Sequence, residues 1–268
     1  MRETAFAKIN LALHVRKRRD DGYHELETLF AFVDAGDELF ARACEEDRLE
    51  VLGEFASALT DPFVNIVTKA LGALPHAGGL RVTLEKNLPV AAGLGGGSAD
   101  AGAIFRMIEQ AYGLPEGWRE KAAKLGADVP ACVESTMHIG RGVGELREEV
   151  ENDLARMPVL LVNPRVPLAT AKVFKAWDGL DKGALPKGTA RTIAEQGRND
   201  LLDPAISICP VIADVLDRLG QTGPWLAQMS GSGATCFALY DDAAQRDNAA
   251  AILATLEADW WQMSGALR

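Results

Sequence analysis

The sequence predicts an α+β fold, because segments with strand periodicity and segments with helix periodicity occur in both halves of the chain without regular βαβ alternation. Of the 268 residues, 48% are hydrophobic and 25% are charged, a composition typical of a globular protein and not of a disordered chain. A chain of this length commonly folds as two lobes or as one large domain. We place a boundary after Met157, which gives predicted domains of residues 1–157 and 158–268.

An N-terminal β-hairpin is expected. Alternate residues from Ala5 to Val15 form one apolar face, which is the pattern of a strand that covers a core. A polar turn over Lys17–Tyr23 leads to a second strand-like stretch over Leu26–Asp34, with a longer loop than the tightest hairpins have. Short apolar runs predict further strands at Leu39–Cys44, Leu80–Glu85, Val159–Asn163 and Thr235–Tyr240.

The clearest helix is expected over Ala99–Tyr112, where Ile104, Ile108 and Tyr112 recur at helical spacing. Gly113 is expected to end this helix, since glycine is common just past the last helical residue. Similar patterns predict helices at Asn65–Leu74, Ile212–Leu219 and Ala243–Glu257.

The formal net charge of −10, from 28 basic and 38 acidic residues, argues against a nucleic-acid or anionic-membrane partner. No apolar run approaches the roughly 20 residues that a membrane helix needs. The start of the chain lacks the features of a signal peptide, so a cytoplasmic location is expected. The 4 cysteines form no CxxC pair and are expected to be free thiols and not zinc ligands. The sequence does not reveal the oligomeric state.

A glycine-rich segment over Pro89–Asp100 follows a predicted strand and opens a predicted helix, with Ser98 as the expected helix cap. Its glycines remove side chains where the backbone must turn sharply or approach a ligand. The unpaired amides and the dipole at a helix N-terminus favour anions, so the segment predicts a phosphate site. A tight connection without a ligand is the alternative. The segment is not a Walker loop, since no lysine follows Gly97, and it is not a dinucleotide fingerprint, since the first strand is outside any βαβ unit.

The chain resembles the GHMP kinase superfamily, which is named for galactokinase, homoserine kinase, mevalonate kinase and phosphomevalonate kinase. Two motifs resemble its ATP loop and its C-terminal glycine motif, and the others fit one member family. The motifs, in the expected order, are Ala7–Leu11, Asp21–Glu25, Thr28–Phe30, Pro89–Ala99, Gly126–Pro130, Arg198–Leu201 and Ser230–Thr235. The resemblance implies a two-lobed GHMP kinase fold, with an N-terminal lobe like ribosomal protein S5 and a ferredoxin-like C-terminal lobe.

Within the superfamily, the N-terminal motifs are similar to those of the 4-diphosphocytidyl-2-C-methyl-D-erythritol kinases. The resemblance implies an ATP-dependent kinase that phosphorylates the 2-hydroxyl of this cytidine diphosphate compound in the non-mevalonate isoprenoid pathway, with ATP and Mg2+ as cofactors. Two alternatives remain open. One is another GHMP small-molecule kinase, of the homoserine or mevalonate type, which the Asp21–His24 turn disfavours. The other is a catalytically silent ligand-binding protein on the same scaffold, which the presence of Lys8 and Asp128 disfavours.

The resemblance also implies roles for single residues. Asp128 is the expected base for the substrate hydroxyl, although on its own it resembles a turn aspartate bonded to nearby backbone. Lys8 is the matching catalytic lysine, expected to lower the pKa of the attacking hydroxyl or of Asp128 and to offset developing negative charge. Lys8 and Asn10 lie on one face of a strand, with Cα atoms roughly 7 Å apart.

Binding residues follow from the same motifs. The expected ATP-binding residues are Pro89, Val90, Ala91, Ala92, Gly93, Leu94, Gly95, Gly96, Gly97, Ser98 and Ala99. The expected substrate-binding residues are Asn10, Tyr23, His24, Thr170 and Phe174. Aromatic faces suit a flat base and a histidine can hydrogen-bond its edge, although Phe174 is equally compatible with a core position. Family members often carry a second serine where Ala99 stands, so Ser98 is the one magnesium ligand expected.

Overall fold

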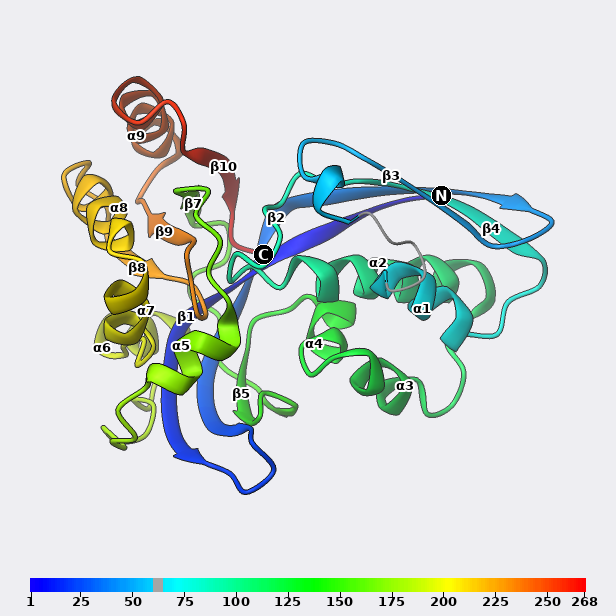
Figure 1. The fold of residues 1–268 in the computed structure, drawn as a ribbon, viewed down its shortest axis with the longest axis horizontal. Helices are drawn as coiled ribbons and strands as arrows, with labels where there is room; N and C mark the ends of the chain where they lie inside the picture. The colour runs from blue at the N-terminus through cyan, green and yellow to red at the C-terminus, as the bar shows by residue number, and fades with distance from the viewer. Residues whose placement is uncertain (60–64) are drawn as a thin grey trace. The chain divides into compact units, whose positions relative to one another are not determined.

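A computed structural model describes residues 1–59 and 65–268 of the chain (Figure 1). The chain divides into two compact units. The first unit comprises Met1–Lys8, Ala35–Val90 and Gly95–Thr136, and the second comprises Ile9–Asp34, Ala91–Leu94 and Met137–Arg268. Strands β1 (Arg2–Arg18) and β2 (His24–Cys44) contribute residues to both units. The predicted boundary after Met157 falls within the second unit, and the two predicted domains stay a prediction.

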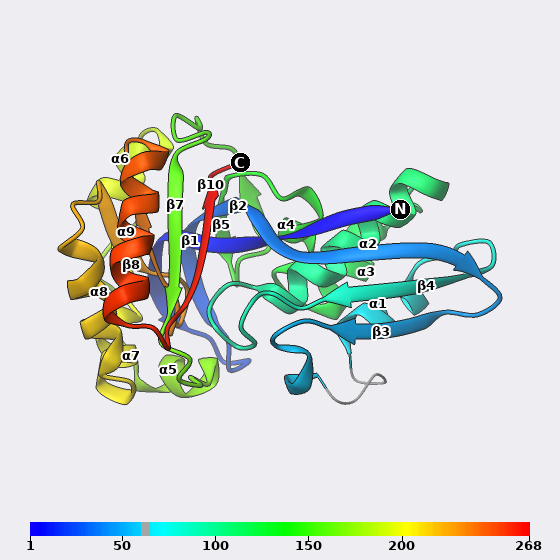
Figure 2. The same cartoon turned by 90° about the horizontal axis from the view of Figure 1, so that it is seen from above.

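The first unit is a sheet with helices on one face (Figures 1 and 2). The Glu38–Cys44 part of β2 pairs antiparallel with β4 (Gly79–Glu85), and β4 pairs parallel with β3 (Arg48–Leu52). The helical elements are η1 (Ala56–Ala58), α1 (Ile66–Ala73), α2 (Gly96–Tyr112), α3 (Trp118–Leu125) and α4 (Val129–Glu134). Buried residues of β4, such as Val82 and Leu84, and of α2, such as Ile104 and Ile108, form its core.

The second unit contains a four-stranded antiparallel sheet in the order β10-β7-β9-β8. Its strands are β7 (Pro158–Asn163), β8 (Leu226–Met229), β9 (Cys236–Leu239) and β10 (Trp261–Ala266). Its helices are α5 (Thr170–Ala176), α6 (Ala190–Gln196), α7 (Leu202–Ile208), α8 (Val211–Gly220) and α9 (Ala243–Leu256), of which α8 and α9 lie against the sheet (Figure 2). The Leu26–Phe30 part of β2 pairs with β5 (His138–Gly142), which pairs with β6 (Leu146–Glu148).

The predicted hairpin is confirmed, because β1 pairs with β2. The two strands expected over Leu26–Asp34 and Leu39–Cys44 are one continuous strand, however, and the glycine between them does not make a turn. A Cβ atom at Gly36 would lie 1.9 Å from the Ala5 carbonyl oxygen, so this glycine lets the β1 backbone approach closely.

The helix expected from Ala99 begins earlier, at Gly96, and ends as expected before Gly113. The prediction of Ser98 as its cap is wrong. The cap residue is Gly95, in the left-handed region at φ +61°, and Ser98 is the third residue of the helix. Glycines normally disfavour a helix interior, but Gly96 packs against a buried ammonium that leaves little room for a side chain.

Among the helices of residues 1–59 and 65–268, none combines the length and the apolar character that crossing a membrane requires.

Candidate active site

Lys8 and Asp128 form an ion pair in the first unit. The Lys8 Nζ atom lies 3.2 Å from Asp128 Oδ2, and the side chains are 7% and 31% exposed. Asp128 immediately precedes α4 but makes no capping hydrogen bond to it, so its carboxylate is directed to the lysine and not to the helix amides. A nearly buried cation therefore faces a carboxylate that solvent or a substrate can still reach.

Close packing of α4 on α2 fixes the position of Asp128. A Cβ atom at Gly102 of α2 would lie 2.6 Å from the Cys132 carbonyl carbon, so only glycine permits this approach. Arg106, also on α2, donates from Nη1 to the Cys132 carbonyl at 2.7 Å and to Ser135 Oγ at 3.2 Å. These contacts hold both the middle and the end of the short helix that begins after Asp128.

The glycine loop ends beside this ion pair. A Cβ atom at Gly95 would lie 3.1 Å from Lys8 Cε and 4.0 Å from Asp128 Oδ2. The first-turn amides of α2, which starts here, lack intrahelical acceptors and carry the positive end of the helix dipole. Ser98 Oγ is 3.7 Å from the Cβ position of Gly126, so the serine lies next to the motif that contains Asp128. The amides at the start of α2, the Lys8 ammonium and the Asp128 carboxylate therefore lie close together in the first unit.

In the second unit, Asn10 is buried in a polar cluster with Ser230. The Asn10 backbone N–H donates to Ser230 Oγ at 3.3 Å, and the Ser230 hydroxyl donates to the Gly93 carbonyl at 2.8 Å. The Asn10 side chain donates to Thr28 Oγ1 at 2.7 Å, and Thr28 donates to the Ala12 carbonyl at 2.7 Å. Three separate predicted motifs, around residues 10, 93 and 230, therefore meet in this unit.

His24 lies in an aromatic cluster at the start of β2. Its ring centroid is 4.8 Å from that of Phe174 and 5.7 Å from that of Trp177, which approaches edge-on. Burial, and secondarily the charge of Arg18, lower the pKa of His24, so the imidazole is neutral. Within the described part of the chain, the buried Nε2 atom of His24 has no hydrogen-bond partner. A neutral ring with an unused nitrogen is suited to the edge of a polar heterocycle.

The other two predicted substrate residues are near this cluster in different ways. Tyr23 is 62% exposed, and its backbone N–H donates to Asp21 Oδ1 at 3.0 Å within the turn. Thr170 is the first residue of α5, the helix that carries Phe174, and its hydroxyl lies 2.9 Å from that of Ser232. The structure brings His24 and Phe174 into contact, whereas the Tyr23 ring extends into solvent.

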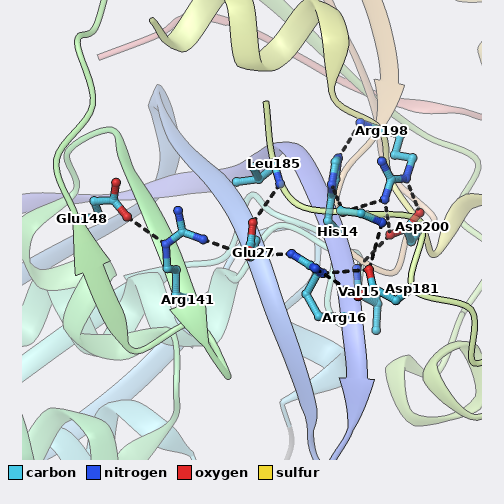
Figure 3. A network of polar contacts seen from close by, with 11 residues as sticks. His14, Val15, Arg16, Glu27, Arg141, Glu148, Asp181, Leu185, Arg198 and Asp200 are labelled. Carbon is cyan, nitrogen blue, oxygen red and sulfur yellow. Dashed lines mark hydrogen bonds and ion pairs between the residues drawn. The ribbon is translucent and has the colours of Figure 1, made fainter. Parts of the chain in front are cut away.

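Figure 3 shows the polar network that secures the segment after α5 to the hairpin. Arg16 donates to both carboxylate oxygens of Asp181, at 2.8 and 3.0 Å, and to Glu27 at 2.8 Å. Glu27 also accepts from the Leu185 backbone N–H at 2.8 Å, and it pairs with Arg141 at 2.9 Å. Charged side chains of both hairpin strands thereby hold the chain that leaves the aromatic cluster.

Buried polar groups continue this network along β1. Asp200 accepts from the Val15 backbone N–H at 2.9 Å and from Arg198 Nε at 2.7 Å. His14 is fully buried, with Nδ1 3.0 Å from the Gly183 carbonyl and Nε2 3.3 Å from the Arg198 backbone N. A ring whose two nitrogens face a carbonyl and an N–H is satisfied as a neutral imidazole, and burial lowers the pKa of His14 accordingly.

Sequence reasoning missed a buried ionic group under the glycine loop, formed by Lys86, Asp37 and Asp100. One signal could have found it. Period-two alternation along β4 and the residues that follow it places Lys86 on the same face as buried Leu84 and Leu88. A lysine on a buried strand face requires carboxylate partners.

The chain is similar to known proteins along nearly its whole length. Residues 63–140 match the GHMP kinases N-terminal domain, and residues 183–259 match the GHMP kinases C-terminal domain. A 4-diphosphocytidyl-2-C-methyl-D-erythritol kinase of Erythrobacter litoralis is 66% identical over 270 residues, covering 99% of each chain. One of Novosphingobium aromaticivorans is 67% identical over 268 residues, covering 100% of this chain and 93% of the relative.

Solved structures extend the comparison to the fold. A crystal structure of 4-(cytidine 5'-diphospho)-2C-methyl-D-erythritol kinase matches with a TM-score of 0.85 and 31% identity, covering 100% of this chain and 99% of the other. A homoserine kinase from Cytophaga hutchinsonii matches with a TM-score of 0.63 at 17% identity, over 98% and 95% of the chains, and shows likeness of fold.

These findings confirm the predicted α+β, two-lobed GHMP kinase fold and the prediction of an ATP-dependent small-molecule kinase with an alcohol acceptor. The chain belongs to the GHMP kinase superfamily and, within it, to the family of 4-diphosphocytidyl-2-C-methyl-D-erythritol kinases.

Proposed function

We propose that this kinase transfers the γ-phosphoryl group of ATP to the 2-hydroxyl of 4-diphosphocytidyl-2-C-methyl-D-erythritol, in the cytoplasm and in the non-mevalonate route to isoprenoid precursors. The names of its relatives support this substrate. The single observation that carries the chemistry is the 3.2 Å ion pair of Lys8 and Asp128 next to Gly95. That arrangement places an acceptor for a proton and a positive charge at the end of an anion-binding loop.

In the proposed reaction, Asp128 accepts the proton of the 2-hydroxyl as its oxygen bonds to the γ-phosphorus, and the bond from that phosphorus to the β,γ-bridging oxygen breaks to release ADP. General-base catalysis of this kind typically contributes about 10²–10⁴-fold to the rate. Lys8 offsets the negative charge that develops on the transferring group and keeps the Asp128 carboxylate oriented. Because Lys8 is nearly buried, little solvent screens its charge.

The glycine loop fits a nucleotide. Gly93 and Gly95 have φ of +79° and +61°, a region that favours glycine, and a side chain at Gly95 would fill the space beside Lys8. We assign residues 89–99 to ATP, with the first-turn amides of α2 and the Ser98 hydroxyl facing its phosphates.

The residues present also fit a Mg2+ ion that is held largely by nucleotide phosphates. No group of three or more His, Cys, Asp or Glu side chains that could hold a metal occurs among the described residues. Magnesium bound with a nucleotide commonly takes only one or two protein ligands. We assign the Ser98 hydroxyl as a ligand, and the bound ion would neutralise phosphate charge.

The aromatic cluster is the proposed cytosine site. His24 offers an unused buried nitrogen to the base edge, and Phe174 offers a ring face 4.8 Å from the imidazole. Tyr23, Thr170 and Asn10 are assigned supporting contacts to the substrate. Homoserine and mevalonate have no planar ring, so a site of this kind favours the cytidyl compound over both.

Steady-state ATP consumption with Mg2+ tests the proposal, with the cytidyl compound, homoserine and mevalonate as separate acceptors. Turnover with the cytidyl compound alone is the expected result. Turnover with homoserine or mevalonate instead would retain the kinase and refute the cytosine site. A protein that binds ADP yet phosphorylates none of the three would refute the proposed acceptor.

A further inference from the structure

Lys86 is buried between two carboxylates in the first unit. Its Nζ atom lies 2.5 Å from Asp37 Oδ2 and 2.7 Å from Asp100 Oδ2, and all three side chains are at most 2% exposed. Lys86 follows β4, Asp37 belongs to β2, and Asp100 belongs to α2. One ammonium group therefore joins three elements of the unit.

The same group holds both ends of the glycine loop. The Oδ1 atom of Asp37 accepts from the backbone N–H groups of Asn87 at 2.6 Å and Leu88 at 2.7 Å, which are the two residues before Pro89. At the other end, the Cβ position of Gly96 lies 3.1 Å from the Lys86 Nζ atom. The backbone that enters the loop and the backbone that opens α2 are thus both anchored to one buried ion group.

We propose that Lys86 is a positioning residue for ATP, which fixes the first turn of α2 and the entry of the glycine loop so that their amides are ready for phosphates. It acts through this backbone and does not contact the nucleotide. The inference rests on the proposed assignment of residues 89–99 to ATP. Burying an ammonium group with two carboxyl groups is costly, and hydrophobic groups of similar size often stabilise a protein equally well. Holding the glycine loop in one geometry would explain why this chain has a buried ionic group here.

The two carboxylates have different environments, which supplies a matched control. Both oxygens of Asp37 accept hydrogen bonds, whereas the buried Oδ1 atom of Asp100 has no partner among the described residues. An asparagine at position 100 keeps an oxygen for Lys86 and places its amide nitrogen where no bond is lost. An asparagine at position 37 must turn an NH₂ group toward Lys86 or toward the two backbone amides.

The test is calorimetric titration of the full chain with Mg·ADP and, separately, with the cytidyl acceptor. Lys86→Arg keeps the positive charge, but its larger head group displaces Gly96, and we expect a loss of ADP affinity of about 10-fold or more. Lys86→Met and Asp37→Asn are expected to show the same loss. Asp100→Asn is expected to bind ADP like the wild type, and acceptor affinity should be unchanged in every variant that folds.

The proposal is overturned if folded Lys86→Arg binds ADP with wild-type affinity, or if ADP and acceptor affinities fall together. If the Lys86 variants do not fold, Asp37→Asn provides the test, because it leaves the lysine in place and disturbs the hydrogen bonds of Asp37 to Lys86 or to the loop entry. A loss of ADP affinity alone would support the proposal, and wild-type ADP affinity or a joint loss of ADP and acceptor affinity would overturn it. A failure of the proposed loop assignment is distinguishable, since the wild type itself would then not bind ADP.

Discussion

The Lys8 ammonium lies 3.2 Å from the Asp128 carboxylate, with the lysine side chain 7% exposed and the aspartate side chain 31% exposed. The Lys8 ammonium is thus almost completely enclosed by protein, whereas the Asp128 carboxylate is accessible to solvent or to a substrate. A proton acceptor needs that access, whereas a charge stabiliser works better with little water around it. The unequal burial of the two partners matches the unequal roles proposed for them.

Asp128→Asn removes the proton acceptor but keeps the size of the side chain. The turnover number should fall by about 10²–10⁴-fold, because general-base catalysis is lost, while the Kd for Mg·ADP stays unchanged. Steady-state kinetics and calorimetry measure the two quantities. Asp203→Asn, which alters an aspartate whose side chain is 86% exposed, is the control and should be silent. Wild-type turnover in Asp128→Asn would place the base elsewhere.

Phe174→Ala removes the ring face beside His24. Stacking of a base on an aromatic side chain is worth about 1–3 kcal/mol, so the KM for the cytidyl acceptor should rise by roughly 5- to 150-fold. The KM for ATP should not change. Phe40→Ala, at an aromatic residue that is 40% exposed on β2, should alter neither constant. An equal rise in both KM values for Phe174→Ala would indicate general damage to the fold.

Acceptor binding should depend on pH through His24. Its pKa is lowered from 6.5 by burial and by Arg18, so the ring is neutral and the KM of the acceptor is constant through neutral pH. The KM should rise only when the pH falls below the ordinary histidine value. Arg18→Gln removes the nearby positive charge, so the rise should begin at a higher pH than in the wild type. The KM measured from about pH 5 to 8 in both proteins tests this, and coincident profiles would contradict it.

Asp200→Ala should destabilise the second unit. Its carboxylate is fully buried and accepts from the Val15 backbone N–H, which is left buried and unpaired in the variant. We expect the free energy of unfolding to fall by about 1–3 kcal/mol, which is the cost of one buried unsatisfied group. Urea unfolding monitored by circular dichroism measures the change. Asp203→Ala, at an exposed aspartate, is the control and should not change the midpoint of urea unfolding.

Asp100 should make stability depend on pH. Its pKa is higher in the folded chain than the ordinary value of 3.8, so the folded state holds a proton that the unfolded state has released. The stabilisation that this proton represents is complete below the unfolded value and is lost as the pH rises through the folded value. Asp100→Asn has no carboxyl group to ionise at this position, so the variant does not lose this stabilisation as the pH rises. The melting temperature of the variant, relative to the wild type, should therefore increase with pH, and a constant difference would refute the raised pKa.

Elements with a strong periodic or apolar pattern could be predicted from sequence, and the shortest helices could not. The apolar face of β1 and the helical spacing in α2 gave correct elements, with ends shifted by a few residues. Helices α4 and α5, of six and seven residues, are too short for a clear 3.6-residue period and depend on packing for their stability. Gly36 lies between two predicted strands that are in fact one, because a sequence does not show that a neighbouring backbone needs the space of its missing side chain.

The candidate site divides in the same way. Glycines and helix amides of the loop are a local signal, and they indicated an anion site from the sequence alone. The ion pair of Lys8 with Asp128 joins residues far apart in the chain, and only the motif resemblance linked them before the structure did. Lys86 was missed, because its two carboxylate partners come from other elements and lie far from it in the sequence.

The core of the second unit has a consequence for how the chain is made. Leu13 and Val15, from the first strand, are buried with Leu253, from the last helix, in one cluster. Ribosomes add residues at about 5–20 per second from the N-terminus, so the first strand emerges early and waits for most of its core partners. Contacts so distant in sequence slow folding, and an apolar strand exposed during that wait is prone to aggregation. For this chain, the strand that carries Lys8 leaves the ribosome well before the last helix that shares its cluster.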